Sequence, residues 1–151
     1  MAQLLAHKDQ SLVSHLEGVS QRAESFAAAF GAAEQGRIAG LVHDLGKAET
    51  EFQKRIHTDD RGEGKKQPHA HHGAAYALRL CDPAQWPVAL AVNGHHAGLH
   101  NRGDVDQAAE KNSEKAKNFI SFLERIAGRI VNFPCEIINQ KYGIIKVSKI
   151  S

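Results

Sequence analysis

Histidine is the residue type that points most directly to chemistry in this sequence. The chain has ten histidines among its 151 residues, and seven of them fall between His57 and His100. Histidine is the commonest side-chain ligand of transition metals, so a surplus gathered in short clusters indicates metal binding. Four clusters stand out: His15 by itself, His43-Asp44 within AGLVHDLGK, the segment PHAHH at 68–72, and the segment GHH at 94–96.

Each cluster also has an ordinary structural interpretation. His15 fits a hydrogen-bonded core histidine, and His43-Asp44 fits a solvated pair at a helix end. Adjacent helical residues point about 100° apart, so this pair could equally bind one metal through nitrogen and a second through a bridging carboxylate. The joint occurrence of such residues on three helices favours metal binding. Nitrogen-rich ligation with one carboxylate suits Fe, Mn, Ni, Co or Zn better than Ca or a site for Mg alone.

The first 130 residues predict helices that could position these groups. Leu12, Leu16, Val19, Ala23, Phe26 and Phe30 recur at steps of three and four, which predicts one inward helix face between an N-cap at Ser11 and a C-cap at Gly31. Ile38, Leu41, Val42 and Leu45 predict the inward face of the next helix. The predicted helices cover about 12–30, 32–45, 49–57, 71–80, 86–95 and 105–130, with loops at 58–68 and 96–104.

The composition excludes several classes of protein. The length fits one domain. There is no apolar run of about 18 residues and no secretory signal, so we expect no membrane span and a cytoplasmic location. Two cysteines without a CxxC spacing predict neither a disulfide framework nor a metal site built from cysteines. The net charge is +2, and the first 130 residues are formally neutral. Any contact with nucleic acid must therefore be local or run through metal ions.

Three motifs together resemble a known family. AGLVHDLGK, PHAHHGAAYAL and NGHHAGLH are similar to the HD nuclease domain of the helicase-nuclease of type I CRISPR systems, a branch of the HD metal-dependent phosphohydrolases. The likeness covers about residues 5–100. It implies an all-α HD-domain helical bundle over residues 1–130 that lacks its last helices.

The resemblance also implies a dinuclear metal site with assigned ligands. His15 and His43 match ligands of the first metal, and Asp44 matches a carboxylate that bridges both ions. His95 and His96 match a pair on the second metal. The remaining ligand of that ion matches His69, four residues before Gly73, with His72 as the alternative. The family closes its first site with an aspartate on a late helix, and this chain offers only Asp104 and Asp106, too close to the GHH segment.

The implied activity is hydrolysis of phosphodiester bonds in single-stranded DNA with two divalent metal ions: Fe, Mn, Ni or Co, with Mg as a further candidate. Asp44 and Lys47 are the implied catalytic residues, Lys47 through contact with substrate phosphate. Lys65, Lys66 and Arg102 are candidates for holding the DNA backbone. The implied partners are an ATP-dependent helicase domain or subunit and the RNA-guided surveillance complex. No GxxxxGK[ST] motif occurs, so we expect either a stand-alone nuclease subunit or the amino-terminal part of a longer protein.

Two rival functions remain open. The HDLGK core also suits a phosphohydrolase of nucleotides or cyclic nucleotides, whereas the absent late aspartate suits a metal-poor module that only binds DNA or a partner. Since Asp44 is expected at a helix end, its replacement is expected to cost little stability.

The last 21 residues differ in pattern from the rest of the chain. Residues 131–151 contain no alanine and read as two short strands around a turn, a C-terminal β-hairpin. They fit a hairpin packed on the bundle or a foreign segment: a frameshifted or fused end, or the opening of an intein, which they loosely resemble from Cys135.

Overall fold

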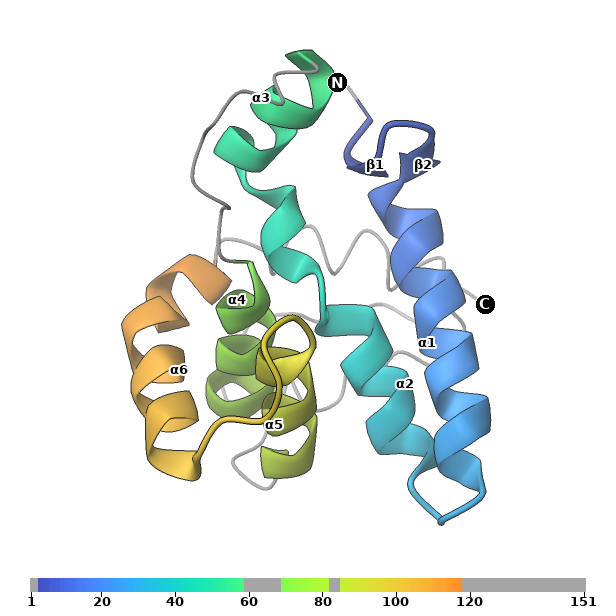
Figure 1. Cartoon of the computed structure of the whole chain (residues 1–151), viewed down its shortest axis with the longest axis vertical. Coiled ribbons are helices and arrows are strands. Elements are labelled where there is room, and N and C mark those ends of the chain that lie inside the picture. The colour runs from blue at the N-terminus through green and yellow to red at the C-terminus, as the bar shows by residue number, and fades with distance from the viewer. Residues whose placement is uncertain (1–2, 59–68, 82–84, 118–151) are drawn as a thin grey trace, which may run out of the picture.

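A computed structural model describes residues 3–58, 69–81 and 85–117, and this part of the chain is mainly helical (Figure 1). It begins with two short antiparallel strands, β1 (Leu5–His7) and β2 (Gln10–Ser11). The remaining elements are the helices α1 (Leu12–Ala28), α2 (Ala33–Val42), α3 (Thr50–Thr58), α4 (Ala70–Ala75), α5 (Trp86–Gly94) and α6 (Arg102–Lys117), the 3-10 turn η1 (Leu45–Ala48) and the π-helical turn η2 (Tyr76–Cys81).

The helices form two groups joined through α2. The antiparallel pair α1 and α2 lies on one side, while α4, α5 and α6 pack together on the other (Figure 1). The fully buried side chains come from both groups and from the turns between them, and include Leu12, Leu16, Leu41, Leu45, Tyr76, Val88, Val92 and Val105. This shared core fixes the ends of α1, α2, α4 and α5 relative to one another. The predicted helical bundle is therefore confirmed.

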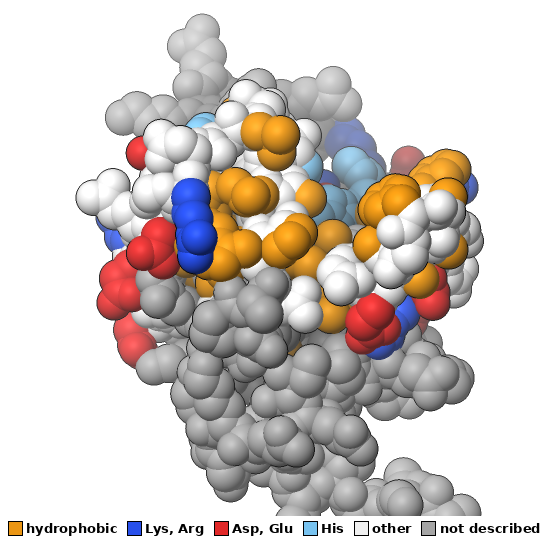
Figure 2. Space-filling view, turned by 90° about the horizontal axis from the view of Figure 1, so that it is seen from below, with side chains coloured by type: hydrophobic (Ala, Val, Ile, Leu, Met, Phe, Trp, Pro, Cys, Tyr) orange, Lys and Arg blue, Asp and Glu red, His pale blue; other side chains and the backbone are white. Residues whose placement is uncertain are grey.

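The packing of α1 on α2 corrects the predicted inward face of the first helix. Ser20 and Ala27 are buried there, whereas Phe26 and Phe30 are each 76% exposed. The two helices approach closely where α2 carries glycine: a Cβ on Gly36 would lie 2.7 Å from that of Ala27. The hydrophobic pattern could not reveal this, because close packing through small residues leaves no apolar stripe. Seen from the lower end of the molecule in Figure 1, apolar side chains gather on its surface (Figure 2).

Helix boundaries follow local capping. Ser11 begins α1 as predicted, and its hydroxyl accepts a hydrogen bond from the Ser14 amide at 3.1 Å. The last helix begins at Arg102, three residues earlier than expected, because Asn101 accepts a hydrogen bond from the Asp104 amide at 2.9 Å. The sequence also missed the hairpin of β1 and β2. The 59–68 part of the predicted loop, the helix beyond 117 and the predicted C-terminal strands lie outside the described residues.

The second helix ends earlier than its hydrophobic pattern suggested. It stops at Val42, and Asp44 adopts φ −109° and ψ 21° before the turn η1 begins. The pattern runs on to Leu45 because η1 buries that residue too. His43 and Asp44 therefore lie at a break in the backbone rather than within a helix.

None of the described helices is long and apolar enough to cross a membrane.

Candidate metal centre

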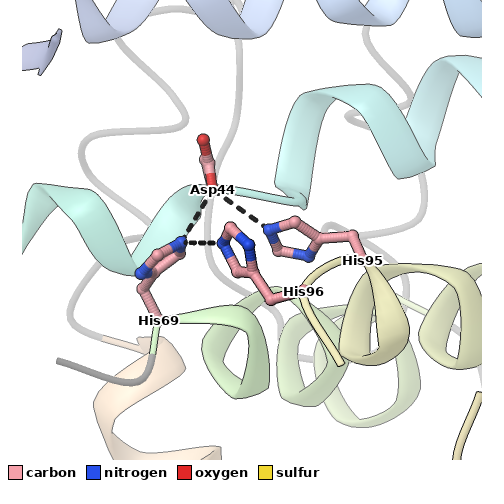
Figure 3. Close-up of side chains that lie close together, drawn as sticks. All are labelled: Asp44, His69, His95 and His96. Carbon is pink, nitrogen blue, oxygen red and sulfur yellow. Dashed lines mark hydrogen bonds and ion pairs between the residues drawn. The ribbon is translucent and has the colours of Figure 1, made fainter. Parts of the chain in front are cut away.

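Two groups of potential ligands meet at one carboxylate. Asp44, His69, His95 and His96 form one group, with all four ligand atoms within 4.8 Å of one another (Figure 3). His15 and His43 form the second group, again with Asp44. We call His15, His43 and Asp44 the first cluster, and Asp44, His69, His95 and His96 the second cluster, after the metal that each would hold.

Each oxygen of Asp44 faces a different cluster. Oδ2 lies 3.0 Å from Nε2 of His15 and 3.2 Å from Nε2 of His43. Oδ1 lies 3.1 Å from Nε2 of His69 and 3.3 Å from Nε2 of His95. His96 completes the second cluster, with its Nε2 atom 2.7 Å from that of His69. The carboxylate is thus placed to bridge two cations, one on each side.

The outer ring nitrogens of three histidines are held by hydrogen bonds. Nδ1 of His43 lies 2.8 Å from the Gly40 carbonyl, and Nδ1 of His95 lies 2.6 Å from the Val92 carbonyl. Nδ1 of His15 lies 3.3 Å from Oε1 of Gln10. Carbonyl oxygens only accept, so Nδ1 carries the proton in His43 and His95, and Nε2 presents its lone pair to the centre.

Two glycines bring these elements together. A Cβ on Gly46, within HDLGK, would lie 2.6 Å from the His69 carbonyl oxygen, so only glycine lets η1 approach the start of α4. A Cβ on Gly73 would collide with the Val42 carbonyl oxygen at the end of α2. Both glycines therefore set the distance between the His43-Asp44 break and His69, and this explains their presence in the two motifs.

The environment of Asp44 favours its charged form. Burial by itself would raise the pKa of this carboxyl group, but three neighbouring imidazoles outweigh that effect and hold the pKa far below its ordinary range. The same contact raises the pKa of His95, against the opposing effect of burial. Burial lowers the pKa of His15 and His96. An ionised carboxylate surrounded by imidazoles suits a cation site.

The donor set fits transition metals. Five imidazoles converge on one carboxylate, and within each cluster the ligand atoms lie within 4.8 Å of one another. Among the described residues, the buried Oδ1 atom of Asp44 has no hydrogen-bond partner of regular geometry, although His69 and His95 approach it closely. A cation at each cluster would satisfy these atoms. Nitrogen donors with one carboxylate favour Fe, Mn, Co, Ni or Zn.

The structure brings together His15, His43, Asp44, His69, His95 and His96, and it places the alternative ligand His72 elsewhere. His72 is 2% exposed, and its Nε2 atom lies 3.2 Å from Oε1 of Glu49. Asp104 and Asp106 belong to neither cluster; Asp104 pairs with Asn101 at the start of α6. Within the described residues, the first cluster therefore has no late aspartate.

The basic residues predicted to bind substrate lie in different surroundings. Lys47 is buried, and its Nζ atom lies 2.8 Å from Oδ2 of Asp44 and 3.4 Å from the Ala6 carbonyl. Its side chain neutralises Asp44 in this structure rather than facing solvent. The guanidinium of Arg102 lies 4.5 Å from the ring centre of Trp86, at the opposite end of α5 from His95. Lys65 and Lys66 lie outside the described residues.

No pattern in the sequence singled out Gln10 as part of the site. This residue reaches His15 only because the short hairpin of β1 and β2 folds back over the start of α1. The hairpin is fixed by Gln53, whose side-chain amide donates to the Leu5 carbonyl at 2.8 Å and to the Lys47 carbonyl at 2.7 Å. A two-residue strand is too short for an alternating pattern to indicate it.

A helical bundle with a shared carboxylate between histidine clusters is the architecture of a metal-binding domain. The HD domain family model matches residues 12–127, and the chain belongs to that family. HD domains are typically metal-dependent phosphohydrolases, and the paired clusters agree with that chemistry. No curated protein matches the chain significantly.

Proposed function

We propose that this protein is a metal-dependent nuclease that hydrolyses phosphodiester bonds in single-stranded DNA as part of type I CRISPR interference. The observation that carries the hydrolytic part is Asp44, whose two oxygens face two separate histidine clusters. The narrower assignment to DNA rests on the resemblance of AGLVHDLGK, PHAHHGAAYAL and NGHHAGLH to the CRISPR branch of the family.

The residues of the chain have distinct tasks in this proposal. His15 and His43 would hold one ion, His69, His95 and His96 the other, and Asp44 both. Bound ions of this kind supply a nucleophilic water and neutralise charge on the phosphate. Lys47 balances the charge of the buried carboxylate and so keeps Asp44 in place between the clusters.

The exposure of the second cluster supports a large substrate. Asp44 is buried, while His95 and His96 are exposed. A phosphodiester in a long strand could reach that side without entering an enclosed cavity. In this proposal, partners recruit the DNA: an ATP-dependent helicase domain or subunit, and the RNA-guided surveillance complex.

The test is an activity assay with metal-supplemented protein. Circular single-stranded DNA, duplex DNA, nucleotides and cyclic nucleotides are each incubated with Mn²⁺, Co²⁺, Ni²⁺, Fe²⁺ or Mg²⁺. We expect cleavage of single-stranded DNA that requires a transition metal and is lost in Asp44→Ala. His57→Ala serves as the control, because this exposed histidine on α3 belongs to neither cluster.

The rival functions predict other outcomes in the same experiment. Hydrolysis of nucleotides but not of DNA would favour the nucleotide phosphohydrolase. Binding of DNA with well below one metal ion per chain, measured by elemental analysis, would favour the non-catalytic module. Undiminished DNA cleavage by Asp44→Ala would overturn the two-metal basis of the proposal.

A further inference from the structure

The PHAHH segment holds three histidines, yet only one of them reaches the metal centre. His69 belongs to the second cluster, while His71 and His72 turn away from it. Nδ1 of His71 lies 2.6 Å from Oδ1 of Asn93, a residue of α5 that is only 4% exposed. This short contact joins α4 to α5, and the metal centre itself does not require it.

The place of this contact relates it to the second cluster. His71 follows the ligand His69 by two residues, and Asn93 precedes the ligand His95 by two residues. His69 is the N-cap of α4 and His95 the C-cap of α5. The contact therefore links the two segments that carry the ligands of the second cluster, within one helical turn of each ligand.

Loss of the contact would leave a buried group without a partner. Asn93 accepts through its amide oxygen, so Nδ1 of His71 is the donor. An amide oxygen that is buried and loses its donor pays the cost of its desolvation, and the neighbouring segments are then free to shift. A displacement at the end of α5 would move His95 and His96 together, because both follow Asn93 within three residues.

We infer that His71 and Asn93 are positioning residues of the second metal site, and that their hydrogen bond sets the separation of His69 from His95 and His96. The inference rests on the metal-binding part of the proposed function and not on DNA as the substrate. Groups that orient metal ligands typically contribute about 10–100-fold to metal affinity. The bond acts on one cluster only, because His15 lies on α1 and His43 directly follows α2.

A matched pair of substitutions tests this role. In His71→Asn, the side-chain amide nitrogen occupies the place of Nδ1 and still donates to Asn93. In His71→Gln, the amide nitrogen lies one carbon further out, near the place of Nε2, and the donor at Nδ1 is lost. Both variants are uncharged and polar, so they differ mainly in whether the bond forms.

The readout is Mn²⁺ affinity by calorimetry on the whole chain, with thermal unfolding in the presence of a chelator to show that each variant folds. We expect His71→Gln, His71→Ala and Asn93→Ala to weaken the second site by about 10–100-fold and to leave the first unchanged. His71→Asn should stay within a few fold of the wild type. The double variant His71→Ala/Asn93→Ala should be no weaker than either single variant, because both remove the same bond. His57→Ala is the control.

Other results would overturn the inference. Unchanged affinity in His71→Gln would show that the bond does not position the ligands. An equal loss at both sites, in proportion to lost stability, would show a general structural role. Wild-type protein that binds no Mn²⁺ would overturn the metal-binding proposal itself and this inference with it, whereas wild-type protein that binds two ions with unaffected variants would overturn the inference alone.

Discussion

Replacing Asp44 with alanine should both empty the metal centre and destabilise the metal-free protein. The side chains of Asp44 and Lys47 are 5% and 9% exposed, and their charged atoms lie 2.8 Å apart. Removing one partner of a buried ion pair costs roughly 3–5 kcal/mol, because the other charge is left without compensation. At about 2–4 °C per kcal/mol for a chain of this size, the melting temperature should fall by roughly 6–20 °C. The sequence analysis expected a small loss of stability on replacing Asp44, because it placed this residue at a helix end. The buried ion pair predicts a larger loss.

A second substitution separates the two effects. In Asp44→Ala/Lys47→Met, the buried ammonium is removed as well, so most of the lost stability should return while metal binding stays absent. Thermal unfolding is followed by circular dichroism in the presence of a chelator, and Mn²⁺ binding by calorimetry. If Asp44→Ala unfolds at the wild-type temperature, or if the double variant is no more stable than the single one, the reasoning from the buried pair is wrong.

Further predictions concern the two clusters and the C-terminal segment. The first cluster lacks a late aspartate among the described residues, so a Mn²⁺ titration should show two unequal affinities, with the weaker lost in His15→Ala; equal affinities in the wild type would contradict this. His69→Ala should empty the second site while His72→Ala should keep it, because His72 faces Glu49 instead; elemental analysis of both variants decides between the two ligands. The raised pKa of His95 means that it holds a proton to higher pH than an ordinary histidine, and the lowered pKa of His15 means the reverse. Since a metal must displace that proton, acidification should weaken the bond of a metal to His95 at a higher pH than its bond to His15 or His96, and calorimetry in two buffers would show proton release on binding at the second site. Deletion of residues 134–151 should leave a folded, metal-binding core if the change in composition after Ile130 marks a foreign segment; a protein that unfolds on deletion would show that the tail is integral.

The sequence by itself indicated the residues of the candidate metal centre. A surplus of histidine in short clusters, with one aspartate beside His43, indicated a nitrogen-rich metal site before any geometry was known. Apolar residues at helical spacing predicted most of the helices, because that spacing records which face of a helix is removed from water. The N-cap at Ser11 was predictable for the same local reason, since its hydroxyl acts on an amide three residues away.

The tertiary structure alone decided how these residues meet. The backbone break at Asp44 points its carboxylate toward the centre. Segments far apart in the chain are joined by the close approach at Gly46 and Gly73 and by the bond between His71 and Asn93. The packing of α1 on α2 likewise depends on glycines that leave no hydrophobic signal, so Phe26 was wrongly expected inside. Local patterns record the burial of a residue and not its partner. The sharing of one carboxylate between two clusters, which the family resemblance implied, is built by the contacts that place four chain segments around Asp44.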